Sequence, residues 1–82
     1  MQASVEISLY PLTERYGTPI LAFIERLQSY PDLEVFPNTM STQIFGDYDR
    51  IMSVLTKEMK AVFAQKKDMV MVFKVVNINL KP

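Results

Sequence analysis

The chain has 82 residues, 49% of them hydrophobic, and its nine basic and nine acidic side chains give a formal net charge of zero. A chain of this length forms one domain, expected here to span residues 1–82, and can bury about 60–65% of its unfolded surface. It has no cysteine and no histidine, which excludes disulfide frameworks, thiolate or imidazole metal sites and a histidine base. The neutral charge argues against a nucleic-acid partner, because binding to phosphates depends on basic residues that release counterions.

Signals for a membrane or for export are not visible in the sequence. No apolar run approaches the roughly 20 residues of a membrane span, and the first residues lack the basic stretch and apolar core of a signal peptide. We therefore expect a cytoplasmic protein with no membrane partner. The hydrophobic content is high for a small chain without disulfides, so part of the apolar surface is expected to lie in a contact between subunits.

The first predicted element is a strand at residues 4–10. Apolar Val5, Ile7 and Leu9 alternate with polar residues, which is the two-residue period of a strand with one apolar and one polar face. Pro11 is expected to end this strand, because proline has no N–H to donate to a sheet. The strand should pack its apolar face against a core and leave the polar face opposite.

A helix is expected after this strand. Thr18 can cap it with its hydroxyl, and Pro19 suits the first helical position. The apolar residues of the helix recur at i, i+3, i+4 and i+7 and form one stripe, which consists of Ile20, Phe23, Ile24 and Leu27. The segment 30–32, which contains a proline, ends the helix.

Two short strands and a second helix are expected next. The strands are predicted at residues 33–36 and 40–46, joined by a short turn. The helix is predicted at residues 48–65, because apolar side chains recur along one side of it. Asp47 is placed to cap this helix, and Asp49 to stabilise its first turn.

The last predicted strand, residues 69–78, is apolar on both faces. The order β-α-β-β-α-β with right-handed crossovers predicts an α+β ferredoxin-like fold, in which two helices cover one face of a four-stranded antiparallel sheet. The other face of the last strand is then expected to pack against a second copy of the chain. Phe73, with Met71 or Val75, is the expected contact. The sequence thus predicts a homo-oligomer, either a dimer or a tetramer.

Two segments of the chain resemble a known family. Residues 4–11 (SVEISLYP) and 39–49 (TMSTQIFGDYD) are similar to motifs of the YkoF-like thiamine-binding family, a strand ending in Ser-x-Tyr-Pro and a segment in which Met-x-Thr precedes Gly-Asp. In layout the resemblance covers the whole chain. It implies a small ferredoxin-like domain that holds thiamine or its hydroxymethylpyrimidine part and forms dimers or tetramers through its sheets. Phe45 departs from the pattern, in which this position is commonly acidic.

The resemblance and the polar pattern together nominate seven ligand-binding residues, which are Glu6, Ser8, Tyr10, Asn38, Thr39, Ser41 and Thr42. Tyr10 could stack on a flat ring, and the Glu6 carboxylate could accept from an aminopyrimidine or balance a cationic thiazolium. The alternatives are a solvated strand face or a plain subunit contact for Glu6, and cover of the sheet edge for Tyr10. For Asn38 and Thr39 the alternative is ordinary turn chemistry. Thr42 has no turn to serve, and its hydroxyl needs an internal partner, either the backbone or a ligand.

The predicted function is non-catalytic binding of a small molecule, a thiamine-like heterocycle, without a cofactor or a metal. Asp47 and Asp49 make a weak metal site, because two carboxylates lack the further oxygen ligands that a cation needs. The alternative is a structural or regulatory homo-oligomer whose ligand is unknown. An acylphosphatase-like enzyme is disfavoured because Gly17 is the only glycine near Arg15 to form a phosphate loop, and an RNA-binding sheet is disfavoured by the neutral charge.

Overall fold

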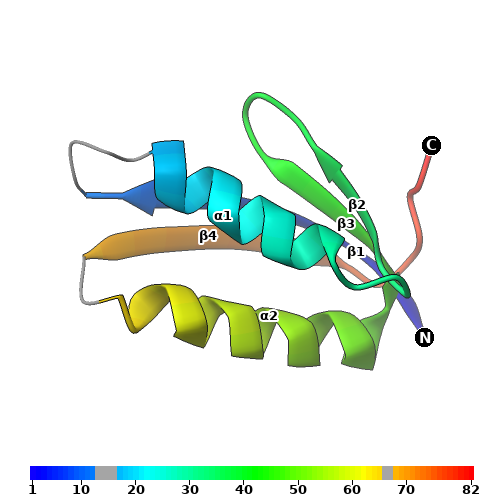
Figure 1. Cartoon of the computed structure of the whole chain (residues 1–82). Helices are drawn as coiled ribbons and strands as arrows, with labels where there is room; N and C mark the ends of the chain where they lie inside the picture. The colour runs from blue at the N-terminus through cyan, green and yellow to red at the C-terminus, as the bar shows by residue number, and fades with distance from the viewer. Residues whose placement is uncertain (13–16, 66–67) are drawn as a thin grey trace.

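The computed structural model describes residues 1–12, 17–65 and 68–82, with only the backbone of residues 17–19. Its elements in chain order are β1 (Gln2–Pro11), α1 (Gly17–Gln28), β2 (Glu34–Pro37), β3 (Thr42–Asp47), α2 (Tyr48–Phe63) and β4 (Met69–Val76) (Figure 1). The predicted order β-α-β-β-α-β is therefore confirmed.

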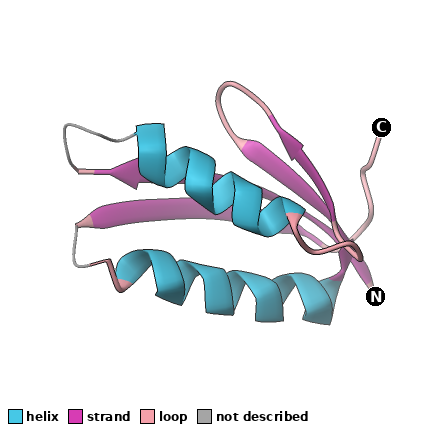
Figure 2. Ribbon diagram, in the orientation of Figure 1, coloured by secondary structure: helices cyan, strands magenta, loops and turns pink. Residues whose placement is uncertain are grey.

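The four strands form one antiparallel sheet in the order β2-β3-β1-β4. Both helices lie on the same side of this sheet (Figure 2). The core lies between the two layers, where Val5 and Ile7 of β1 belong to the same buried cluster as Leu27 of α1 and Leu55 of α2. This arrangement is the ferredoxin-like α+β fold that the sequence predicted.

The register assigns each strand residue to one face of the sheet, because directly opposed residues of an antiparallel pair point to the same side. Ile7 and Leu9 are buried beneath the helices and lie opposite Phe73 and Met71 of β4. Phe73, Met71 and Val75 therefore belong to the helix side, and the prediction that they contact a second sheet across the open face is wrong. The open face of β4 instead carries three valines, which are Val70, Val72 and Val76.

Two prolines that were expected outside the strands lie inside them. Pro11 is the last residue of β1, and Pro37 is the last residue of β2. The next residues, Leu12 and Asn38, donate main-chain hydrogen bonds of 2.9 Å across to the neighbouring segment. Because N–H groups alternate in direction along a strand, the prolines occupy positions whose N–H would point away from that neighbour, and no ladder bond is lost.

Other element ends also differ from the predicted ones. β3 begins at Thr42, so Met40 and Ser41 belong to the loop between β2 and β3 rather than to the strand. β4 ends at Val76 rather than at residue 78, because the chain there leaves the edge of the sheet. α2 ends at Phe63, two residues earlier than its apolar pattern suggested.

α1 begins at Gly17, one residue before its predicted cap. Thr18 therefore lies within the first helical turn, whereas an N-cap residue flanks the helix. The side chains of Thr18 and Arg15 lie outside the described residues. The predicted stripe of α1 faces the sheet, with Phe23 and Leu27 buried in the core and Ile20 and Ile24 half-buried.

The segment that follows β4 crosses part of the open face. The Ser4 hydroxyl donates to the carbonyl oxygen of Ile78 and accepts from the N–H of Leu80, both at 2.7 Å. Lys81 forms an ion pair with Glu34 of β2, at the opposite edge of the sheet from β4. Ser4 is buried as a result, although it lies on the open face.

Asp47 caps α2 as predicted, since its carboxylate accepts from the N–H of Arg50 at 3.1 Å. We expect Asp47→Ala to lower the free energy of unfolding by about 0.5–2 kcal/mol, the usual loss for an N-cap. Chemical denaturation measures this loss. Asp49→Ala is the matched control, because it removes a charge from the same turn and should cost only about 0.3–1 kcal/mol. A smaller loss for Asp47→Ala than for Asp49→Ala would contradict the capping role.

Candidate functional site

The C-terminal end of β1 has a strand beside it on only one side. β1 pairs with β4 as far as Pro11, but with β3 only as far as Ile7, which lies opposite Thr42. The chain next to that point is the loop of residues 38–41 between β2 and β3. Residues 8–11 of β1 therefore have no paired strand on the β3 side.

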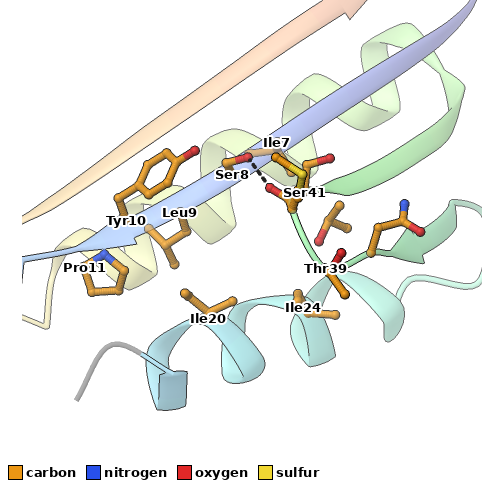
Figure 3. A pocket seen from close by; sticks show the side chains of 12 residues that line it. Ile7, Ser8, Leu9, Tyr10, Pro11, Ile20, Ile24, Thr39 and Ser41 are labelled. Atoms are coloured by element: carbon orange, nitrogen blue, oxygen red, sulfur yellow. Dashed lines mark hydrogen bonds between the residues drawn. The ribbon is translucent and has the colours of Figure 1, made fainter. Parts of the chain in front are cut away.

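A cavity of about 350 Å³ lies at this unpaired end, bordered by β1, α1 and the loop between β2 and β3 (Figure 3). Leu9 points toward Ile20 and Ile24 of α1, whereas Tyr10 lies on the other side of β1 (Figure 3). The cavity therefore reaches around the edge of the sheet, from the apolar helix side to the polar open face.

Six of the seven predicted site residues line this cavity, which are Ser8, Tyr10, Asn38, Thr39, Ser41 and Thr42. They come from two segments that are about thirty residues apart in the chain, and the loop brings them together. The Ser8 hydroxyl donates to the carbonyl oxygen of Met40 at 3.3 Å, which ties β1 to this loop. Asn38 also serves the turn, because its side-chain amide donates to the carbonyl oxygen of Phe36.

Glu6 does not line the cavity. Its carboxylate forms an ion pair with Lys74 of β4 at 2.9 Å and accepts from the Ser41 hydroxyl at 3.1 Å. The hydrogen bond from Lys74, followed by that from Ser41, lowers the pKa of Glu6 below its ordinary value. Glu6 is thus already engaged by two side chains, and it orients Ser41 at the rim. Its contact with a ligand stays a prediction. Lys74 was missed, because only the register shows that it lies opposite Glu6.

Thr42 lies on the helix side of β3 and is 5% exposed. It also lines the cavity. Among the residues that the structure describes, none forms a hydrogen bond with the Thr42 hydroxyl. Buried hydroxyls are almost always paired. The Thr42 hydroxyl therefore lacks its usual partner, and it is placed to form a hydrogen bond with a molecule in the cavity.

A second polar cluster lies between the helices and was not predicted. Glu58 of α2 is 1% exposed and accepts from Arg26 Nε at 3.1 Å, from Arg26 Nη2 at 3.3 Å and from the Tyr30 hydroxyl. Arg50 lies 5.3 Å from the centre of the Tyr30 ring and pairs with Asp32 at 2.6 Å. The sequence carried one signal for this cluster, since Glu58 interrupts the apolar stripe of α2 at a position that faces the core.

Within the described residues no three acidic side chains gather as a metal site. None of the described helices is long and apolar enough to cross a membrane. The fold and the cavity together define the class of protein, a small ferredoxin-like α+β domain with a ligand-sized cavity at one edge of its sheet.

No family model and no curated protein matches the sequence, but several solved structures match the fold. One is a protein of Thermotoga maritima, provisionally described as a thiamine biosynthesis/salvage protein, with 18% identity and a TM-score of 0.85 over 95% of this chain and 85% of its own. A hypothetical protein of Methanocaldococcus jannascii has 25% identity and a TM-score of 0.81 over 99% and 84%. A domain of unknown function (DUF77) from Bacillus cereus has 17% identity and a TM-score of 0.79 over 98% and 79%.

These similarities establish the ferredoxin-like fold over nearly the whole chain. Sequence identity of this level does not establish a family, so the resemblance to the YkoF-like family stays a prediction. The identity of the ligand also stays a prediction, because fold alone does not determine what a domain binds.

Proposed function

We propose that this chain binds a flat nitrogen heterocycle, either thiamine or its hydroxymethylpyrimidine part, without converting it. The observation that carries the proposal is the cavity at the unpaired end of β1, where apolar residues of the helix side meet a polar rim. Pockets of this kind bind a ring between apolar walls and orient it with a few polar groups. The volume of about 350 Å³ is near the small end of the roughly 300–1,000 Å³ found for ligand pockets, which favours the single pyrimidine ring.

The side chains around the cavity have separate parts in this proposal. Ile20 and Ile24 provide apolar surface for one face of the ring, and exposed Tyr10 provides aromatic surface at the rim. The Thr42 hydroxyl offers a hydrogen bond inside the cavity. No turnover is proposed, because the chain has no histidine or cysteine and the Glu6 carboxylate beside the rim is engaged by Lys74.

Two further observations support this ligand class. The segments that resemble the YkoF-like thiamine-binding family, residues 4–11 and 39–49, include most of β1 and most of the loop that borders the cavity. The fold is also that of the Thermotoga maritima protein provisionally described as acting in thiamine biosynthesis or salvage. The proposal keeps the cytoplasmic location expected from the sequence.

Titration calorimetry with hydroxymethylpyrimidine and with thiamine tests the proposal. We expect saturable binding, and Thr42→Val should weaken it about 3–10-fold, because a neutral hydrogen bond contributes about 0.5–1.5 kcal/mol. Thr56→Val is the matched control, since it removes an exposed hydroxyl from α2, and it should leave the affinity unchanged. No heat from either ligand at millimolar concentration would contradict the proposed function.

The second candidate function is that of a structural or regulatory homo-oligomer. The observation in its favour is a set of exposed apolar side chains on the open face of the sheet, which are Phe36, Val70, Val72 and Val76. Exposed apolar patches of this kind usually mark an interface. We therefore propose that a second copy of the chain covers this face in a dimer or a tetramer, with or without a ligand.

Analytical ultracentrifugation at micromolar concentration tests this assembly. We expect a species of at least two subunits, and Val72→Lys should shift it toward the monomer, because the charge would be buried in the interface. Leu21→Lys is the control, because Leu21 is an exposed apolar residue on α1, away from the sheet. A single species at the monomer mass of 9.5 kDa at every concentration would contradict the assembly.

A further inference from the structure

The main chain of Leu9 is directed toward the cavity. In an antiparallel sheet the N–H and C=O of one residue go to one neighbouring strand, and those of the next residue go to the other. The N–H of Leu12 donates to the carbonyl oxygen of Asp68 at 2.9 Å, so the even-numbered residues of β1 bond toward β4. The N–H of Tyr48 donates to the carbonyl oxygen of Met1 at 2.8 Å, so the odd-numbered residues bond toward β3. The N–H and C=O of Leu9 therefore point to the β3 side.

β3 does not extend far enough to pair with Leu9. The last paired residues are Ile7 and Thr42, and the same register would place Met40 opposite Leu9. Met40 instead lies in the loop with 88% of its surface exposed, and its carbonyl oxygen accepts from Ser8. In the described part of the chain no main-chain group bonds to Leu9 from that side. Leu9 is itself buried, and buried main-chain groups are almost always paired.

We propose that the ligand takes the place of this missing strand. The N–H of Leu9 donates to a ring nitrogen, and the C=O of Leu9 accepts from an amino group on the adjacent ring carbon. This inference rests on the proposed function and narrows it to heterocycles that carry an amino group next to a ring nitrogen, as the aminopyrimidine of thiamine does. A ring that is held in this way lies in line with the sheet, between the apolar side chains of α1 and the polar rim.

The unpaired Thr42 hydroxyl is a second group placed for the same ligand. Thr42 lies opposite Ile7, two residues before Leu9, which is a separation of about 7 Å along the strand. A substituent on the far side of the ring from the amino group would point toward this hydroxyl. The cavity thus presents the N–H and C=O of Leu9 at one end and the Thr42 hydroxyl at the other. Because the Leu9 main chain selects an amino group next to a ring nitrogen, Leu9 is the residue that determines the class of ligand.

Amide spectra of nitrogen-labelled protein, recorded while hydroxymethylpyrimidine is added, test the inference. We expect the Leu9 amide proton to show one of the largest shifts and to gain protection from hydrogen exchange. The Tyr10 amide is the internal control, because it is directed to β4 in the free protein and should gain no protection. The dimethylamino analogue of the pyrimidine cannot donate to the Leu9 carbonyl, and it should bind at least about 10-fold more weakly.

A pair of variants of the protein tests whether the main-chain N–H of Leu9 donates to the ligand. Leu9→Pro removes the N–H at a position that makes no ladder bond, and Leu9→Val is its match, because it trims the side chain but keeps the N–H. We expect the proline variant to bind about 3–10-fold more weakly than the valine variant. If the proline variant does not fold, the comparison of the pyrimidine with its dimethylamino analogue decides the matter alone.

The outcomes separate this inference from the function on which it rests. Shifts at Ile24 and Thr42 with no change at the Leu9 amide, together with equal affinity for the pyrimidine and its dimethylamino analogue, would overturn the inference and leave the proposed function standing. A spectrum in which no residue of the cavity responds to the pyrimidine would overturn both.

Discussion

Replacing Glu58 with alanine should lower the free energy of unfolding by about 2–4 kcal/mol, because hydrogen bonds to a charged group contribute about 1.5–3 kcal/mol each. Glu58 of α2 is buried and accepts hydrogen bonds from Arg26 of α1 and from Tyr30, which follows α1 in the chain. Its removal leaves the Tyr30 hydroxyl without this partner and leaves a space in the layer above the sheet. The loss is a large share of the roughly 5–15 kcal/mol that stabilises a domain.

Chemical denaturation measures this effect, and Glu25→Ala is the control. Glu25 is an exposed glutamate on α1, so its replacement should change stability by no more than about 0.5 kcal/mol. If Glu58→Ala and Glu25→Ala unfold at the same denaturant concentration, the cluster around Glu58 does not hold the helices together.

The same cluster gives stability a dependence on pH. Burial raises the pKa of Glu58, but the hydrogen bonds from Tyr30 and Arg26 and the charge of Arg26 outweigh burial and hold the pKa below its ordinary value of 4.5. A group with a lowered pKa in the folded state stabilises the fold above its unfolded pKa, and the contribution is lost as the pH falls through the folded pKa. The difference in free energy of unfolding between the parent protein and Glu58→Gln should therefore be largest near neutral pH and should decrease at acidic pH. A difference that stays constant down to about pH 3 would contradict the lowered pKa.

Replacing Ile24 with tryptophan should abolish ligand binding. Ile24 lines the cavity from α1, and the larger ring would occupy the space proposed for the heterocycle. Because the side chain enters an existing cavity, we expect it to cost no more than the roughly 1–3 kcal/mol of an overpacked core, so the protein should stay folded.

Leu21→Trp is the matched control for this change, since it adds the same ring to the same helix at an exposed position. It should bind the pyrimidine with the affinity of the parent protein, as measured by titration calorimetry. Full affinity in Ile24→Trp would place the ligand elsewhere on the molecule.

The fold could be predicted from the sequence because each of its elements has a local hydrophobic pattern. The alternation of Val5, Ile7 and Leu9 and the stripe of α1 each indicate one element, and the order of elements then determines the topology. The faces of β4 were not accessible in the same way, because a strand that is apolar on both sides has no pattern to orient it. Only the pairing with β1 shows that Phe73 lies on the helix side.

The candidate site was accessible in part. Polar residues around Ser8 and Thr42 stood out against apolar surroundings, and the structure brings most of them to one cavity. The ion pair of Glu6 with Lys74 depends on register between distant strands, and the unpaired main chain of Leu9 depends on where β3 ends. Neither feature can be predicted from the local sequence pattern, because each results from the pairing of distant strands.

The central claim is that the cavity at the unpaired end of β1 binds the heterocycle. A map of amide shifts on addition of hydroxymethylpyrimidine tests it most directly, because the map reports position independently of any variant. The account predicts that the shifts cluster at residues 7–10 and 38–42 and at Ile20 and Ile24, which line the cavity. Shifts that cluster on the open face at Val70, Val72 and Val76, or no shifts at saturating ligand, would contradict it.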